Sequence, residues 1–208
     1  MKKVLSVLMA VVMLLGMFVV TTSAATAPTI KATASKSSAK VGDTITVTVS
    51  TSKNSKLCAT TLNLTYNAQY FEVTGQSSSG AFEMESIKPT AGSIEFMGIT
   101  GMSKPTVADS ATTLFTVSFK VLKTGGTIKL SASEIYVADG NKDVDVTSKI
   151  AGNTLTISCS HANKKETILR QATCTEKGSK KTVCNDCGHD FGKTDIPATG
   201  HNYGSMTV

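Results

Sequence analysis

The sequence predicts an all-β chain, namely an antiparallel β-sandwich of roughly nine strands followed by a small module rich in cysteine and histidine. Two observations predict this class. Runs of β-branched and aromatic residues alternate with polar residues at a period of two, which is typical of strands with one buried face. Turn signals rich in Gly, Asn and Ser separate the runs, and no segment after the N-terminal one shows a convincing helical period.

The strongest strand signals lie between Val41 and Val73. After Gly42-Asp43 the chain alternates, so that one face carries Ile45, Val47 and Val49. A turn-rich break precedes a second run, in which Leu62, Leu64 and Tyr66 share a face. An apolar segment with Phe71 and Val73 follows the Asn67-Ala68 corner. Together these runs predict the first half of a sandwich.

The second half repeats the pattern. Residues 111–122 place four apolar side chains on one face, namely Phe115, Val117, Phe119 and Val121. Residues 93–99 alternate between two sets, with Ile94 and Phe96 on one face and Glu95, Met97 and Ile99 on the other. Further strands are expected at 27–39, 81–87, 127–133, 134–138, 144–150 and 154–158, with loops or turns at 76–80, 88–92 and 100–110.

Three regions are expected along the chain. Residues 1–25 combine Lys2 and Lys3, a long apolar run and a small-residue end, which predicts a Sec-type signal peptide; an uncleaved membrane anchor is the alternative. Residues 26–158 form the sandwich. Residues 159–208 hold four of the five cysteines and all three histidines but few large apolar residues, so this module needs a metal or disulfides to be ordered.

Composition argues against two classes of function. The net charge of +6 includes Lys2 and Lys3 of the expected signal peptide, and the remaining lysines are scattered without interleaved aromatics, so nucleic-acid binding is not expected. The chain has no GxSxG motif and no Ser-His-Asp set, because every histidine lies in the tail. A sandwich without tryptophan is also a poor glycosidase. We therefore expect a protein that is not an enzyme.

Taken in order, four segments resemble cohesin modules: VGDTITVTVSTS, LTYNAQYFEV, GSIEFMGIT and TTLFTVSFKVLKTGG. The resemblance covers about residues 27–157. It implies a jelly-roll-like extracellular sandwich, related in fold to some carbohydrate-binding modules, that acts as a scaffold in the manner of cellulosomes. One departure is Ala68-Gln69-Tyr70, where the family commonly has Pro and then an apolar residue.

The resemblance also implies a partner. Cohesins bind dockerins, small calcium-loaded helical modules, and so attach secreted glycoside hydrolases to complexes that degrade polysaccharides at bacterial surfaces. Cohesins use one sheet face for this contact. By alternation, the face would carry Ala59, Thr61, Asn63, Glu95 and Met97. A carbohydrate-binding module and a cell-surface adhesion or display protein are the alternatives; the first would need a row of exposed aromatics, for which the candidates are Tyr66, Tyr70, Phe71, Phe82 and Tyr136.

The tail predicts a structural zinc site. Cys184 and Cys187 form a CxxC pair, Cys174 lies upstream, and His161 or His201 would supply the fourth ligand, with His189 a lesser candidate. Two disulfides or free thiols are the alternatives, with Cys58 left over and buried in the sandwich. The segments Ser160-His161, ATCTEKG at 172–178, CNDCG at 184–188 and IPATGH at 196–201 resemble one unit of a repeat found in surface proteins of gut Firmicutes. His161 and His201 lie 40 residues apart, which matches one repeat period.

Overall fold

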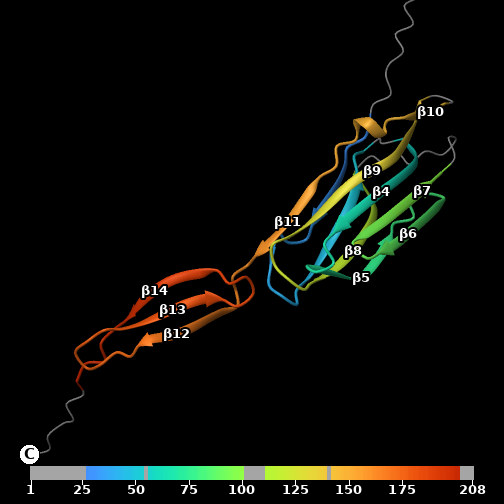
Figure 1. Ribbon diagram of the computed structural model, residues 1–208. Coiled ribbons are helices and arrows are strands. Elements are labelled where there is room, and N and C mark those ends of the chain that lie inside the picture. The colour runs from blue at the N-terminus through green and yellow to red at the C-terminus, as the bar shows by residue number, and fades with distance from the viewer. Residues whose placement is uncertain (1–26, 54–55, 101–110, 140–141, 202–208) are drawn as a thin grey trace, which may run out of the picture.

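The computed structural model describes residues 27–53, 56–100, 111–139 and 142–201. The expected signal peptide and the loop at 101–110 lie outside these ranges. The described chain forms three β-sheets, two of which face each other as a sandwich, while the third extends from one end of it (Figure 1). Among the described residues, no helix is long and apolar enough to cross a membrane.

The first sheet of the sandwich has four antiparallel strands in the order β1-β3-β8-β5. Their bounds are Ile30–Ala34 for β1, Thr44–Thr51 for β3, Thr112–Val121 for β8 and Phe71–Ser78 for β5. The expected loop at 76–80 is wrong for its first residues, because Gln76 and Ser78 pair with Val117 and Phe115 of β8. A serine-rich sequence is thus held in a strand by its neighbour's backbone.

The second sheet has the order β2-β11-β9-β4-β7-β6, and β10 pairs with β9. The bounds are Ser38–Ala39 for β2, Leu57–Tyr66 for β4, Met84–Thr90 for β6, Ser93–Ile99 for β7, Gly126–Asp139 for β9, Lys142–Asp145 for β10 and Thr154–Cys159 for β11. The strands expected at 127–133 and 134–138 are one continuous strand, bent by a bulge where it faces Thr61 and Leu62. A short 3-10 helix, η1 at Thr147–Lys149, takes the place of the end of the strand expected at 144–150.

The core lies between these two sheets, as the alternation predicted. The inward side chains of β3, β4, β7 and β8 are fully buried, including Ile45, Leu62, Phe96, Phe115 and Phe119. Phe96 and Phe115 stack across the sheets with ring centroids 4.6 Å apart. Each such side chain contributes about 1.5–3 kcal/mol by leaving water, so this layer accounts for most of the stability of the sandwich.

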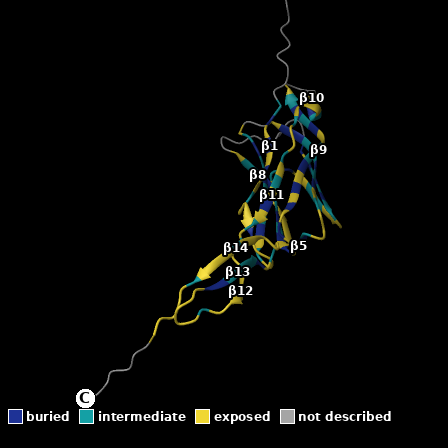
Figure 2. Cartoon of the chain, turned by 60° about the vertical axis from the view of Figure 1, so that its left-hand side comes forward, coloured by how far each residue is buried: buried dark blue, intermediate teal, exposed yellow. Residues whose placement is uncertain are grey.

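The third sheet has three antiparallel strands in the order β12-β13-β14, with bounds Lys164–Arg170, Gly178–Cys184 and Asp190–Ile196. Figure 2 shows that its surface is mostly exposed, in contrast to the buried interior of the sandwich. None of its residues belongs to the hydrophobic core cluster of the described chain. Its order must therefore depend on something other than apolar burial.

Candidate functional site

The outward residues of β4 and β7 form a continuous surface. Alternation along β4 buries Leu62 and Leu64 and leaves Ala59, Thr61 and Asn63 half-exposed. The same alternation in β7 buries Ile94 and Phe96 and leaves Glu95 and Met97 half-exposed. The two strands pair so that Thr61 lies opposite Met97 and Asn63 lies opposite Glu95. All five residues predicted for the contact face therefore lie on one side of the sheet, side by side.

Neighbouring strands extend this surface, which we call the β4–β7 face. On one side, β6 places Met84, Ser86 and Lys88 opposite Ile99, Met97 and Glu95. On the other side, β9 places Glu134 opposite Thr61 and Ser131 opposite Asn63. The face is thus four strands wide and combines hydroxyl, amide, carboxylate, ammonium and thioether groups.

Polar side chains on the face are held by their neighbours. The Thr61 hydroxyl donates to Glu134 Oε2 at 3.4 Å, and Asn63 Nδ2 donates to Ser133 Oγ at 3.1 Å. The bond at 3.1 Å restricts the rotamer of Asn63, and the longer Thr61 contact restricts Thr61 more weakly. Such restriction would lower the entropy cost of a contact made by this face.

The face also exposes apolar atoms. Met84 is 65% exposed and Ile99 is 38% exposed, and the two lie opposite each other in the pairing of β6 with β7. Met97 is half-exposed two residues before Ile99 on the same side of β7. Flexible thioether side chains adapt to partners of different shape. The apolar corner formed by Met84, Met97 and Ile99 can be desolvated in a contact. The part of the face around Thr61 and Asn63 offers hydrogen-bonding groups.

A sugar-binding row of aromatics does not form on this face. Phe71 and Phe82 are buried in the core, and Tyr66 packs edge-on against Phe119 with ring centroids 5.1 Å apart. The Tyr70 ring lies under Lys123 Nζ, 5.1 Å from its centroid. Among the aromatic candidates, Tyr136 alone has a place on the face, opposite Ala59. One ring does not make the coplanar platform that sugars require.

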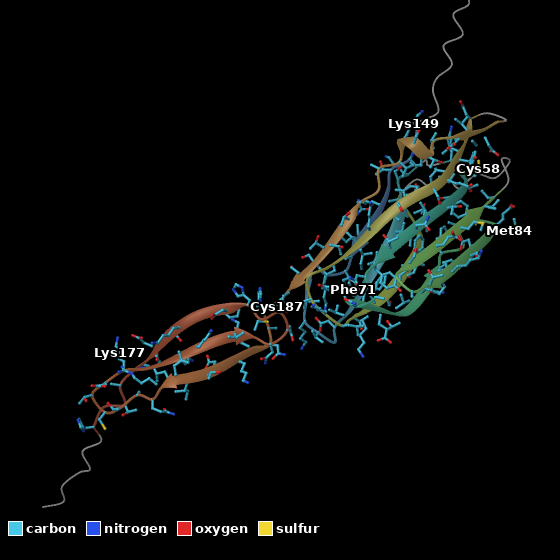
Figure 3. All side chains as sticks on the ribbon, viewed as in Figure 1. Cys58, Phe71, Met84, Lys149, Lys177 and Cys187 are labelled. Atoms are coloured by element: carbon cyan, nitrogen blue, oxygen red, sulfur yellow. The ribbon has the colours of Figure 1, made fainter. Side chains whose placement is uncertain are left out.

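A second group of chemically active side chains lies where the tail joins the sandwich. The ligand atoms of Cys159, His161, Cys184 and Cys187 all lie within 4.8 Å of one another. Cys159 Sγ and Cys184 Sγ are 3.6 Å apart, and Cys187 Sγ lies 3.3 Å from His161 Nδ1. Figure 3 shows Cys187 at the end of the tail nearest the sandwich. We call these four residues the Cys/His cluster.

The cluster contains three of the five residues predicted as zinc ligands. Cys174 and His201 are not brought to it. Cys174 lies in the loop between β12 and β13, where its carbonyl accepts the Gly200 N–H, so His201 follows directly at the same place. That loop also holds Lys177, which Figure 3 places at the far end of the tail. Cys159 was missed, although its position two residues before His161 was a usable signal.

The three thiols of the cluster influence one another. Burial alone would raise the pKa of Cys159, but hydrogen bonds from the His161 amide and the neighbouring thiols lower this pKa below its ordinary value. For Cys187 the His189 amide acts to lower the pKa, yet desolvation and the nearby Cys159 and Cys184 sulfurs outweigh it and raise the pKa to about 11. The arrangement therefore favours one thiolate at Cys159, while crowding disfavours a second one at Cys187.

Comparison with known proteins identifies the sandwich. The cohesin domain family matches residues 30–158, which is more than half of the 208 residues. The chain belongs to the cohesin family, and the β4–β7 face lies on the outer side of one of the two sheets of its sandwich. No curated protein matched the chain.

Solved cohesin structures share the fold. The seventh ScaB type I cohesin from Pseudobacteroides cellulosolvens is 16% identical, with a TM-score of 0.50, and the match covers 64% of this chain and 92% of that one. The sixth cohesin of scaffoldin B from Acetivibrio cellulolyticus, solved in complex with a dockerin, is 14% identical with a TM-score of 0.50, covering 65% and 100%. At these identities the likeness shows the fold.

Proposed function

We propose that this chain is a secreted, non-catalytic scaffold or adaptor protein whose β4–β7 face binds dockerin-bearing proteins. The observation that carries the proposal is the strand register, which gathers Ala59, Thr61, Asn63, Glu95 and Met97 on one exposed sheet face. Membership in the cohesin family supports it, as does the relative from Acetivibrio cellulolyticus that was solved with a dockerin. The expected signal peptide at residues 1–25 supports export to the cell surface or beyond.

The face has the composition of a specific, reversible interface. Its apolar corner of Met84, Met97 and Ile99 would be covered by a helix of the dockerin, since a flat sheet and a helix bury apolar area efficiently against each other. Thr61 and Asn63, which already bond to Glu134 and Ser133 on the same face, would hydrogen-bond the partner's polar groups. Calcium would be required on the partner, where oxygen ligands order the dockerin loops.

The partners we propose are secreted glycoside hydrolases that carry dockerins, which would place the chain in polysaccharide degradation. Calorimetry tests this with residues 26–208 and a panel of dockerins, titrated with calcium and then with a calcium chelator. Soluble β-glucans and xylans are titrated in parallel. Calcium-dependent binding to a dockerin supports the proposal. Binding to glycans alone would overturn the proposal in favour of a carbohydrate-binding module. Binding to neither would refute the proposal for the dockerins in the panel.

A matched pair of threonine variants locates the contact. Thr61 lies on the β4–β7 face, and Thr48 is equally half-exposed on β3, in the other sheet of the sandwich. Thr61→Arg should weaken dockerin binding at least about 30-fold, because a perturbation at the centre of an interface costs about 2 kcal/mol or more. Thr48→Arg should leave the affinity unchanged. Equal effects of the two variants would contradict the assigned face.

A further inference from the structure

The Cys/His cluster draws its members from both parts of the molecule. Cys159 is the last residue of β11, a strand of the sandwich, and His161 follows two residues later. Cys184 ends β13 of the third sheet, and Cys187 lies in the turn after it. Each side of the junction thus contributes one pair of residues. One residue separates Cys159 from His161, and two residues separate Cys184 from Cys187.

The spacing of the four groups fits a tetrahedral metal ion. With a Zn–S bond of about 2.3 Å, two sulfurs of a tetrahedral site lie about 3.8 Å apart, and a sulfur and an imidazole nitrogen lie about 3.6 Å apart. The observed separations are 3.6 Å for Cys159 Sγ and Cys184 Sγ, and 3.3 Å for Cys187 Sγ and His161 Nδ1. The remaining pairs lie within 4.8 Å, so small rotamer changes suffice to surround one ion.

Backbone geometry holds both pairs in position. His161 has φ 53°, a region that a non-glycine residue rarely occupies. This conformation aims the His161 N–H at Cys159 Sγ, 3.4 Å away. In the second pair, the Gly188 N–H donates to the Cys184 carbonyl at 2.8 Å, with Gly188 at φ 74°. The unusual backbone conformation of His161 thus places its own amide N–H against the Cys159 sulfur.

The third sheet needs such a site to be ordered. Every residue of β12 is exposed, including Ile168 and Leu169, whose side chains are each more than half exposed. Cys184 is the single buried apolar side chain among the described residues after Cys159. Three strands without an apolar core are not stable in water alone, and bound metal commonly supplies the missing free energy in small domains.

Among the described residues, hydrogen bonds also join the tail to the sandwich. The N–H of Ser160, the first residue after β11, donates to the Ala39 carbonyl of β2 at 3.0 Å. The Thr124 hydroxyl donates to the Asp186 carbonyl at 3.4 Å. An ion held by Cys159 on one side and by Cys184 and Cys187 on the other would be the strongest connection across this junction.

We propose that Cys159, His161, Cys184 and Cys187 bind one structural zinc ion that fastens the three-stranded tail to the cohesin sandwich. Three thiolates and one imidazole in tetrahedral spacing select zinc among common divalent ions. All four positions are filled by protein, so the site has no open position for catalysis. The site is independent of dockerin binding and stands whether or not that function holds.

Matched cysteine variants of residues 26–208 test the ligand set. Zinc content is measured by mass spectrometry of the metal, and affinity by competition with a chromophoric chelator. Wild type should carry one zinc ion. Since loss of an outer-shell partner already costs about 10–100-fold in affinity, Cys159→Ser and Cys187→Ser should cost at least about 100-fold. Cys174→Ser, at the far end of the tail, should match wild type.

Histidine variants and cobalt add independent readouts. His161→Gln should weaken zinc binding. His189→Gln should not, because the His189 ring packs against the rings of His161 and Phe191, each with centroids 4.8 Å apart, and is not a member of the cluster. Cobalt in place of zinc should give a thiolate charge-transfer band that falls with each cluster cysteine removed. Cys187 is exposed in a turn, so its variant leaves the sandwich folded, which circular dichroism checks.

Limited proteolysis tests the fastening itself. Removing zinc should raise the cleavage rate at residues 160–163 by at least about tenfold, because the connection then opens without unfolding the sandwich. Three results would overturn the proposal: a reduced wild-type protein that binds no zinc, loss of zinc in Cys174→Ser but not in Cys159→Ser, or identical cleavage rates with and without zinc. A wild-type mass showing disulfides among the cluster cysteines that exclude zinc would also overturn it.

Discussion

Replacing Gly98 with alanine should destabilise the sandwich from directly beneath the β4–β7 face. Gly98 lies in β7 between Met97 and Ile99, with its missing side chain directed inward. A Cβ there would lie 2.4 Å from Phe82 Cδ2 and 2.7 Å from both Phe82 Cε2 and Cγ. Overpacking of this kind costs about 1–3 kcal/mol, and alanine in place of a strand glycine returns about 0.5–1 kcal/mol. Taking the middle of each range, the expected net loss is about 1 kcal/mol.

Urea unfolding followed by circular dichroism measures this loss, and two further variants sharpen it. Gly75→Ala is the matched control, because its Cβ would meet nothing closer than Ser118 Cβ at 3.9 Å. It should be neutral or slightly stabilising. In a Phe82→Ala background, Gly98→Ala should cost nothing, because the clashing ring is gone. A Gly98→Ala protein as stable as wild type, or an equal penalty in both backgrounds, would refute the assigned packing.

Three more outcomes follow from the sandwich. Asn153→Ala should cost about 1–3 kcal/mol of unfolding free energy, because Asn153 accepts the Ala32 N–H at 2.8 Å and donates to the Ala32 carbonyl at 2.9 Å; Asn153→Asp, whose second carboxylate oxygen would face the Ala32 carbonyl oxygen, should lose at least as much, and an Asp variant as stable as wild type would contradict the pairing. Phe119→Ala should cost about 3–5 kcal/mol in the same assay, since Phe119 is fully buried, whereas Phe191→Ala in the tail should leave the sandwich transition in place. Burial and then the Asp143 carboxylate raise the pKa of the Cys58 thiol from 9.0 to about 11. The folded-state pKa is therefore above the unfolded one, so Cys58 adds stability below pH 9 that is lost as the pH rises towards 11. Cys58→Ala should flatten this part of the pH profile, and an unchanged profile would show that the thiol is not responsible.

Alternation predicted the sandwich well, because successive side chains of a strand point to opposite faces, so a strand buried on one face alternates apolar and polar residues. Ile45, Val47 and Val49 are fully buried, as expected, and so are Ile94 and Phe96. Strand ends were harder to predict. The serines at the end of β5 have no strand propensity of their own, and they extend the strand only because β8 offers backbone partners. Pairing across the chain is invisible to local patterns.

The same limit explains the outcome for the cysteines. Spacing along the tail suggested Cys174 as a partner for the Cys184 and Cys187 pair, whereas the structure places Cys159 there. Cys159 was counted with the tail, but it is positioned by the sandwich through its pairing with Ala39. A site shared between two folding units cannot be derived from the spacing within one of them.

The pairing of β11 with β2 has a consequence for the order in which the molecule assembles. Cys159 acquires its place only when the last sandwich strand meets Ala39 near the start of the chain. Contacts so distant in sequence form late, since closing long loops is slow. The Cys/His cluster is therefore incomplete until the cohesin domain has folded from end to end. Metal uptake, monitored in real time with cobalt, would then follow the final folding step of the sandwich.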